Sequence, residues 1–127
     1  MFANCQLMGI DIAFPDVCKS PVVPIPWPNF ALGCTAIPKA WNILYLCTPA
    51  HNLATTTPLT NGDNAGVGLG VVVPRVMSES RHTIGAFTLR IKGSPQTRVT
   101  SLTRQNGGNA FGMRIVPSQP KILVLAA

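Results

Sequence analysis

The chain has 127 residues, of which 46% are apolar and 11% are charged, and its formal net charge is +6. Disordered chains are rich in charge and poor in Val, Ile and Leu, so this composition argues against disorder. The longest apolar runs are interrupted by Pro, Gly or Asn, which excludes a membrane-spanning helix of roughly 18 residues. With 12 Pro and 11 Gly, the chain is expected to form an all-β, turn-rich fold in a single domain, residues 1–127.

Most of the positive charge lies in the second half of the chain. Eight of the ten basic residues follow Pro74: Arg75, Arg81, Arg90, Lys92, Arg98, Arg104, Arg114 and Lys121. A basic segment of this kind can attract nucleic acid, an anionic membrane surface or an acidic protein. The aromatic residues Trp27, Trp41 and Tyr45 lie in the other half, where they cannot form a stacking platform beside the charges. We therefore expect no nucleic-acid partner, and either solvated strand faces or an acidic partner.

The N-terminal segment does not have the features of a secretory signal. Met1 to Ala13 has no basic n-region and contains Asp11. We therefore expect a cytoplasmic location in the producing cell until the protein is exported by another route. Because nothing marks an oxidising compartment, free thiols are favoured over two disulfides for the four cysteines: Cys5, Cys18, Cys34 and Cys47.

Proline dominates the next segment, Pro15 to Pro28. Proline cannot donate to a β ladder, and it pushes the preceding residue toward extended geometry. We expect this segment to run extended along an edge or surface of the domain without pairing.

An internal repeat follows. Six residues recur 46 positions later: Ile43, Tyr45, Pro49, Leu53, Thr55 and Thr57 correspond to Leu89, Ile91, Pro95, Val99, Ser101 and Thr103. Each copy predicts a strand (Trp41 to Leu46; Gly85 to Lys92), a turn (Cys47 to Pro49; Gly93 to Pro95) and a return strand rich in Thr or Ser. A partial third copy, with a strand from Lys121 to Ala126, resembles Pro38 to Leu46. About three similar hairpins predict pseudo-threefold symmetry.

A glycine-rich stretch lies between the two full copies. The loop Asn61 to Gly66 requires turns with positive φ. Gly66, Gly68 and Gly70 then alternate with apolar residues, which favours a strand with close backbone approach or sharp bending. A phosphate-binding loop is not expected, because no helix former and no Lys-Ser/Thr pair follows.

Residues for catalysis are scarce. The chain has four acidic residues, none close in sequence to another: Asp11, Asp16, Asp63 and Glu79. The sequence therefore offers no obvious pair of carboxylates for a general acid/base mechanism. A dyad of Cys18 or Cys47 with His51 or His82 is the remaining catalytic alternative. We expect a protein that is not an enzyme.

Metal binding is the better chemical hypothesis. Two His and four Cys could supply the N and S ligands that tetrahedral zinc prefers. Cys47 and His51 have a spacing that can converge on a metal where the chain turns. The structural alternative stays open: His51 satisfies backbone groups of the turn, and Cys47 packs as a small apolar residue.

Six short segments, in order along nearly the whole chain, carry a family resemblance: Met1 to Asn4, Phe14 to Cys18, Pro24 to Asn29, Thr48 to Leu53, Asn61 to Gly66 and Pro117 to Lys121. Together they resemble the PAAR-like spike-tip domains of type VI secretion and related contractile injection systems. The repeated segments Pro49-Ala50-His51-Asn52 and Pro95-Gln96-Thr97-Arg98 are similar to that family's Gly/Lys-Pro-Ala-Ala-Arg unit.

The resemblance implies a small cone-shaped protein with a pseudo-threefold repeat of β-hairpins and Pro/Gly-rich loops. Its broad base would dock on the blunt end of the trimeric VgrG spike, one copy per trimer, and its apex would contact the target membrane during piercing. The implied function is a structural tip that caps and sharpens the spike and helps to recruit an effector or chaperone. The alternative is a small secreted toxin or effector enzyme delivered by the same system.

The resemblance also bears on the metal. In the family's PAAR domains, three His and one Cys hold a zinc that ties the apex together, whereas this chain has only two His. Carried over residue by residue, the resemblance implies Cys18 and His82 as ligands, with His51 third. A zinc here would act as a staple for loops that a small tapered fold cannot hold by apolar burial alone.

Overall fold

A computed structural model describes residues 1–20, 23–64 and 67–125. The predicted all-β fold is confirmed, and every strand pair is antiparallel. The helical segments described are the short 3-10 turns η1 (Gly33–Thr35) and η2 (Asn106–Gly108). Within the described part of the chain, no helix is long and apolar enough to cross a membrane.

The strands form one large sheet and two separate hairpins. The six-stranded sheet has the order β2-β1-β10-β9-β6-β5, and the hairpins are β3-β4 and β7-β8. The bounds of the strands are β1 (Ile10–Ser20), β2 (Val23–Leu32), β3 (Ala40–Tyr45), β4 (Thr48–Ala50), β5 (Thr56–Thr57), β6 (Ser80–His82), β7 (Ala86–Ile91), β8 (Ser94–Gln96), β9 (Leu102–Gln105) and β10 (Ala110–Val116).

The two hairpins follow the sequence repeat residue for residue. Leu44 pairs with Pro49 in the first hairpin, and Arg90 pairs with Pro95 in the second. Each turn has two residues with positive φ, Leu46-Cys47 (50° and 64°) and Lys92-Gly93 (51° and 79°), as a type I′ turn requires. The turns therefore come earlier than predicted, because Pro49 and Pro95 lie within strands β4 and β8.

The two ends of the chain together form a third hairpin-like pair. Phe2 forms a bridge with Leu123, and the N–H of Val124 donates to the carbonyl of Met1 at 2.7 Å. The strand predicted for the partial third copy is wrong in the described residues 121–125, where Leu123 forms an isolated bridge and no strand. Of its predicted strand, Ala126 lies outside the described residues.

A closed ring of backbone hydrogen bonds marks the pseudo-threefold axis. The N–H of Asn4 donates to the carbonyl of Thr97 (3.0 Å), that of His51 to Asn4 (3.0 Å) and that of Thr97 to His51 (3.4 Å). Three bridges repeat one register around this ring: Cys5 with Ala50, Asn52 with Gln96, and Arg98 with Ala3. Three segments that are far apart in the sequence are thereby tied into one cyclic unit.

One side chain occupies the centre of this ring. The amide nitrogen of Gln96 donates toward the three ring carbonyls, those of Thr97 (2.7 Å), His51 (2.9 Å) and Asn4 (3.4 Å). The register places Ala3 and Ala50 at the positions equivalent to Gln96. Both alanines are completely buried. We infer that the axis holds a single long side chain, which explains why this position breaks the repeat.

The interior is filled mainly by polar side chains rather than by large apolar ones. Its apolar clusters consist mainly of alanines, with Val124 and Ile91 as the larger buried members. The largest fully buried side chains among the described residues are all polar: Arg114, His51, Gln96, Gln105, Gln119, Asn4, Asn29, Asn52, Asn106, Thr60, Thr97 and Thr103. Because buried polar groups destabilise a fold unless they are hydrogen-bonded, this protein depends on side-chain hydrogen bonds to an unusual degree.

The described parts of the proline-rich segment, residues 15–20 and 23–28, lie in paired strands, contrary to prediction, whereas Pro21 and Val22 lie outside the described residues. Asp16 lies opposite Trp27 and Lys19 opposite Pro24 in the long β1-β2 hairpin. The expectation of an edge position is correct, since β2 is the outermost strand of its sheet. Pro24, Pro26 and Pro28 alternate along β2, so their missing N–H groups fall on the same side of the strand and can all face away from β1.

The glycine-rich stretch also differs from its prediction. The described residues 67–73 form turns and bends instead of a strand, although Gly70 bridges to Cys18 and its neighbours Gly68, Leu69 and Val71 make backbone hydrogen bonds to β1. The close approach expected at Gly70 is confirmed, because a Cβ there would overlap the side chain of Asn109. The predicted positive φ is present at Gly62 (127°). Ala65 and Gly66, which belong to the same predictions, lie outside the described residues.

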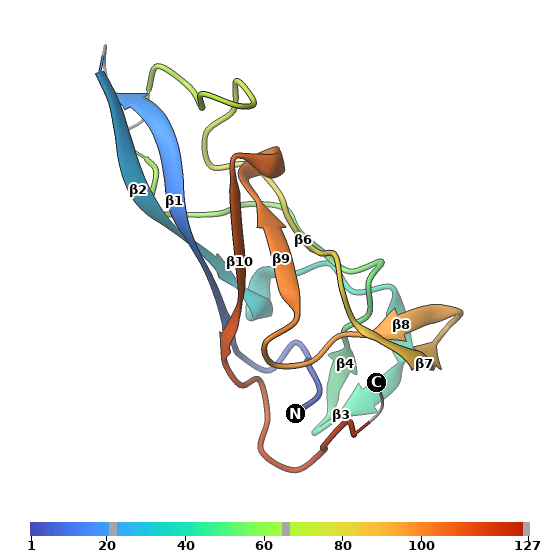
Figure 1. Ribbon diagram of the computed structural model, residues 1–127. Helices are drawn as coiled ribbons and strands as arrows, with labels where there is room; N and C mark the ends of the chain where they lie inside the picture. The colour runs from blue at the N-terminus through green and yellow to red at the C-terminus, as the bar shows by residue number, and fades with distance from the viewer. Residues whose placement is uncertain (21–22, 65–66, 126–127) are drawn as a thin grey trace.

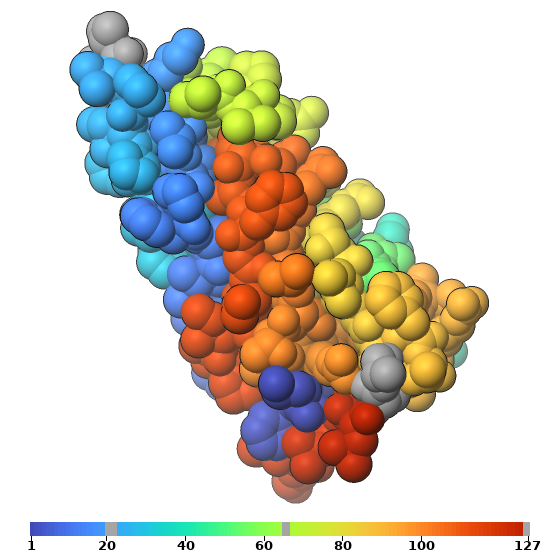
Figure 2. Space-filling view, in the orientation of Figure 1, coloured from blue at the N-terminus to red at the C-terminus, as the bar shows by residue number. Residues whose placement is uncertain are grey.

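The molecule tapers from a broad end to a narrow end. Hairpins β3-β4 and β7-β8 lie at the broad end together with the N-terminus, whereas the β1-β2 hairpin runs into the narrow end (Figure 1). The space-filling view shows the same taper, with the loop that follows residue 66 packed against the narrow end of β1 (Figure 2). The predicted cone-like outline therefore agrees with the structure.

The ring predicts a strong effect of charge at Gln96. Gln96→Glu keeps the size of the side chain but places carboxylate oxygen against ring carbonyls, and we expect it to lower the free energy of unfolding by at least about 3 kcal/mol. Gln96→Ala should cost about half as much, because it leaves carbonyls unpaired without adding charge. Urea unfolding measures both. Asn42→Asp, the same chemical change on an exposed residue, is the matched control, and equal stability of Gln96→Glu and Asn42→Asp would contradict the ring.

Candidate functional site

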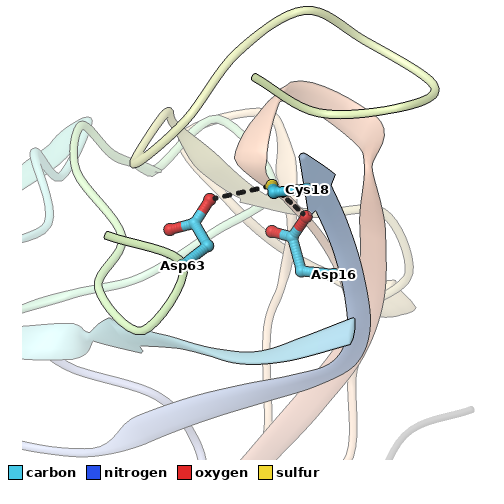
Figure 3. A group of neighbouring side chains, drawn as sticks. All are labelled: Asp16, Cys18 and Asp63. Atoms are coloured by element: carbon cyan, nitrogen blue, oxygen red, sulfur yellow. Dashed lines mark hydrogen bonds between the residues drawn. The ribbon is translucent and has the colours of Figure 1, made fainter. Parts of the chain in front are cut away.

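A compact group of potential metal ligands lies on the half of β1 that runs toward the narrow end. Asp16 and Cys18 project from the same face of β1, and Asp63 reaches them from the loop after β5 (Figure 3). One ligand atom from each residue lies within 4.8 Å of the other two, and all three residues are buried. Two carboxylates and a thiol are a donor set that can hold a metal ion.

Neutral donors surround the two carboxylates. Asn106 donates through its amide nitrogen to Oδ2 of Asp63 (2.7 Å) and to Oδ2 of Asp16 (3.1 Å). Asn29 adds a hydrogen bond to Asp16 (2.9 Å), and the N–H of Met77 one to Asp63 (3.2 Å). None of these donors carries a charge, so hydrogen bonds do not neutralise the pair of acids.

Burial favours the protonated forms of Asp16 and Cys18 over their charged forms. Burial raises the pKa of Asp16, and the nearby Asp63 raises it further, against hydrogen bonds from Asn106, Cys18 and Asn29 that lower it. The pKa of the Cys18 thiol is raised to about 12, first by burial and then by the two carboxylates. A proton or a metal cation would relieve this concentration of negative charge.

Two oxygen atoms beside the group have no described partner. These are Oδ1 of Asp63 and Oδ1 of Asn29, each in a residue that is completely buried. An oxygen atom that is buried without a partner is costly, and in native proteins it commonly indicates an unseen water or ion. The donor set, its burial and these two oxygens are compatible with a bound cation.

The structure separates the three predicted zinc ligands. Cys18 belongs to the group with Asp16 and Asp63. His51 lies in the backbone ring, and its Nε2 is buried without a described partner. His82 lies at the end of β6, where its Nε2 is 3.4 Å from the amide nitrogen of Asn4. Cys18, His51 and His82 do not form one ligand cluster among the described residues.

A buried ion pair lies beside the two histidines. Arg114 donates to both carboxylate oxygens of Asp11, and it also donates to Oγ of Ser118 at 2.7 Å. Nε2 of His82 is 3.8 Å from the same carboxylate. Because Arg114 neutralises Asp11, this part of the interior does not need an external cation.

Sequence reasoning missed the two acids of the group. It discounted the carboxylates because they are far apart in the sequence, but the fold brings Asp16 and Asp63 together. Only the structure supplies the relation between them: residues 16 and 63 are 47 positions apart, as are the ring residues Asn4 and His51. The expected free thiols are present, and the four cysteines form no disulfide.

The fold and the site together define a class of protein. The tapered all-β fold and the pseudo-threefold hairpins agree with what the resemblance to PAAR-like domains implies. A family model described as Toxin PAAR-like domain matches residues 9–112. The chain therefore belongs to the Toxin PAAR-like domain family. Searches of curated proteins and of solved structures found no match.

The buried histidines predict a loss of stability in acid. Burial, with Arg114 adding to it, lowers the pKa of His51 to about 3, and burial lowers the pKa of His82 to about 4. Because both values lie below the ordinary value of 6.5, stability is fully present above pH 6.5 and falls as the pH decreases toward 4. Between pH 7 and pH 4.5 we expect a loss of about 2–3 kcal/mol per histidine.

Urea unfolding across this pH range provides the measurement. His51→Gln and His82→Gln should each flatten the dependence of unfolding free energy on pH, and the double variant should be nearly flat between pH 5 and 6.5, where few carboxylates titrate. A double variant with the slope of the unsubstituted protein would show that these histidines are not buried in their neutral form.

Proposed function

We propose that this protein is the structural tip of a contractile injection apparatus of the type VI secretion class, where it caps the trimeric VgrG spike. The observation that carries the proposal is the closed backbone ring of Asn4, His51 and Thr97. A single chain with this pseudo-threefold geometry can match a threefold partner with one copy per trimer. Membership of the Toxin PAAR-like domain family supports the same function.

The broad end carries apolar side chains suited to docking. Trp41 on β3 and Phe87 on β7 occupy equivalent positions of the repeat and are 60% and 55% exposed. The third, terminal pair exposes Leu123 and Leu125. Large apolar residues that are exposed at corresponding positions of a repeat favour an interface, because their burial against a partner is worth about 25 cal/mol per Å².

The proposed mechanism is mechanical. A trimeric β spike ends in strand edges whose N–H and C=O groups are unpaired, and such edges invite aggregation. A base with pseudo-threefold strand geometry would cover these edges and continue the spike into a narrow point. In this function the protein acts without catalysis, and effectors or chaperones would be carried by surfaces outside the docked base.

The docking test compares the two ends of the molecule. The purified chain is mixed with a trimeric VgrG spike, and the mass of the complex is measured by light scattering. We expect one copy per trimer, and we expect Trp41→Asp and Phe87→Asp each to weaken binding at least about tenfold, which is about 1.4 kcal/mol. Val72→Asp is the control, because Val72 is 74% exposed in the loop packed at the narrow end. No complex at micromolar concentration would refute the proposal.

The toxin alternative makes a different prediction. A delivered toxin enzyme should inhibit growth when the chain alone is produced inside a susceptible cell, whereas a structural tip should not. The Trp41→Asp variant separates the two functions further, because loss of docking would leave an enzymatic toxin active inside that cell.

We further propose that Asp16, Cys18 and Asp63 hold a zinc ion. The proposal is supported by the three donor atoms within 4.8 Å, their burial, and the partnerless Oδ1 of Asp63. Thiolate and carboxylate are both zinc ligands, and bound zinc would favour the deprotonated thiol despite its raised pKa. Metal binding would replace hydrogen bonds that Asn106 gives to the two carboxylates.

Elemental analysis of protein purified without added metal tests the zinc site. We expect about one zinc per chain, lost in Cys18→Ser and in Asp63→Asn but kept in the control Cys34→Ser, because Cys34 is exposed and outside the group. The alternative is that a proton, instead of zinc, neutralises this group of side chains. In that case the protein is free of metal, and its stability falls as the pH rises above the ordinary value for Asp, because the pKa of Asp16 is raised. Asp16→Asn would then abolish that fall.

A further inference from the structure

A pocket lies on the six-stranded sheet, away from the metal-ligand group. Its volume is about 380 Å³, and its lining comprises Leu53, Glu79, Arg81, His82, Thr83 and Arg104. Strands β6 and β9, which lie side by side (Figure 1), supply three of the six lining residues, Arg81, His82 and Arg104. None of the lining residues belongs to the apolar residues of the base hairpins proposed to meet the spike.

Two arginines lie side by side in the lining of this pocket, and the guanidinium of Arg104 also donates to the carbonyl of Gly107 at 3.2 Å. Arg81 on β6 and Arg104 on β9 are direct cross-strand partners, and both are exposed. Like charges placed directly opposite on neighbouring strands destabilise a sheet. Glu79 offsets part of this repulsion from 3.7 Å, but that pair is solvent-exposed and therefore weak. The arrangement is best explained if an anion between the two guanidinium groups is part of the functional state.

The side chains that line the pocket have a net charge of one positive unit, from two arginines and one glutamate. Arg81 and Arg104 are cationic, Glu79 is anionic, and His82 is neutral at physiological pH because burial lowers its pKa to about 4. An anion with a single negative charge would neutralise the pocket. A doubly charged phosphate would be repelled by Glu79, whereas a planar carboxylate can accept paired hydrogen bonds from a guanidinium group.

The whole surface favours an acidic partner. Three of the four acidic residues are buried, and Glu79 alone reaches the surface. By contrast, eight basic residues are exposed: Lys19, Lys39, Arg75, Arg81, Arg90, Lys92, Arg104 and Lys121. The surface is therefore more positive than the formal net charge of +6 suggests. Such a surface attracts acidic segments over a Debye length of about 8–10 Å at physiological salt.

We propose that this pocket binds an Asp or Glu side chain from an acidic segment of a partner protein, with the carboxylate held between Arg81 and Arg104. Leu53 offers an apolar contact for the methylene groups of that side chain. This partner is distinct from the spike, because the pocket and the exposed residues of the base hairpins are formed by different strands.

Calorimetric titration with a hexaglutamate peptide at low salt tests the pocket. Arg81→Gln and Arg104→Gln should each weaken binding at least about fivefold, which is about 1 kcal/mol. Arg90→Gln, an equal loss of charge at an exposed residue of β7, should change it less than about twofold. The free Arg104→Gln protein should also be slightly more stable than the unsubstituted chain, because the cross-strand repulsion is gone.

Further titrations separate the source of the anion. Inorganic phosphate should bind more weakly than the peptide, and Glu79→Gln should strengthen phosphate binding because it removes the repelling carboxylate. Equal effects of Arg81→Gln and Arg90→Gln would show that the peptide binds through the general positive charge of the surface, and this result would overturn the proposal. Binding to phosphatidylserine vesicles that depends on Arg81 and Arg104, without peptide binding, would overturn it in favour of a lipid surface. Spike binding by Arg81→Gln, measured by light scattering, shows whether docking is intact.

Discussion

The structure depends on the ring of backbone hydrogen bonds that joins Asn4, His51 and Thr97. A chain of this size with an interior of alanines and amides gains little from apolar burial, so its elements must be fixed by directed bonds. The ring brings together three segments from distant parts of the sequence, and Gln96 fills its centre. Each hairpin leaves the ring in an equivalent direction, which gives the broad end its threefold character.

The buried polar groups form a series along β1. Near the ring, Asp11 is neutralised by Arg114, and the histidines stay neutral. Toward the narrow end, Asp16 meets Asp63 without a basic partner among the described contacts. Charge is therefore balanced at one level of the interior and unbalanced at the other. That contrast is the reason for proposing a cation at Asp16 and Asp63 and not at the histidines, where a second positive charge would face Arg114.

The sequence repeat predicted the hairpins and their symmetry because each copy carries its own alternation and turn. It could not predict the ring, which depends on contacts between copies, nor the pairing of β1 with β2, since local proline rules say nothing about which side of a strand lacks a partner. The site was predicted only at Cys18. The contact between Asp16 and Asp63 was missed because the two residues are far apart in the sequence, and the histidines were assigned by resemblance to a motif that this chain carries incompletely.

Burial of the acids has a further consequence for recognition. Because Asp11, Asp16 and Asp63 face inward, the basic residues outside are left with little compensation. The exposed apolar residues lie on the hairpins, whereas the paired arginines lie on β6 and β9. Apolar and electrostatic attraction therefore come from different strands. Apolar docking acts only at contact, whereas charge acts at a distance and weakens with salt. The proposed contact with the spike and the proposed acidic partner would therefore use different strands and interactions of different range and salt dependence.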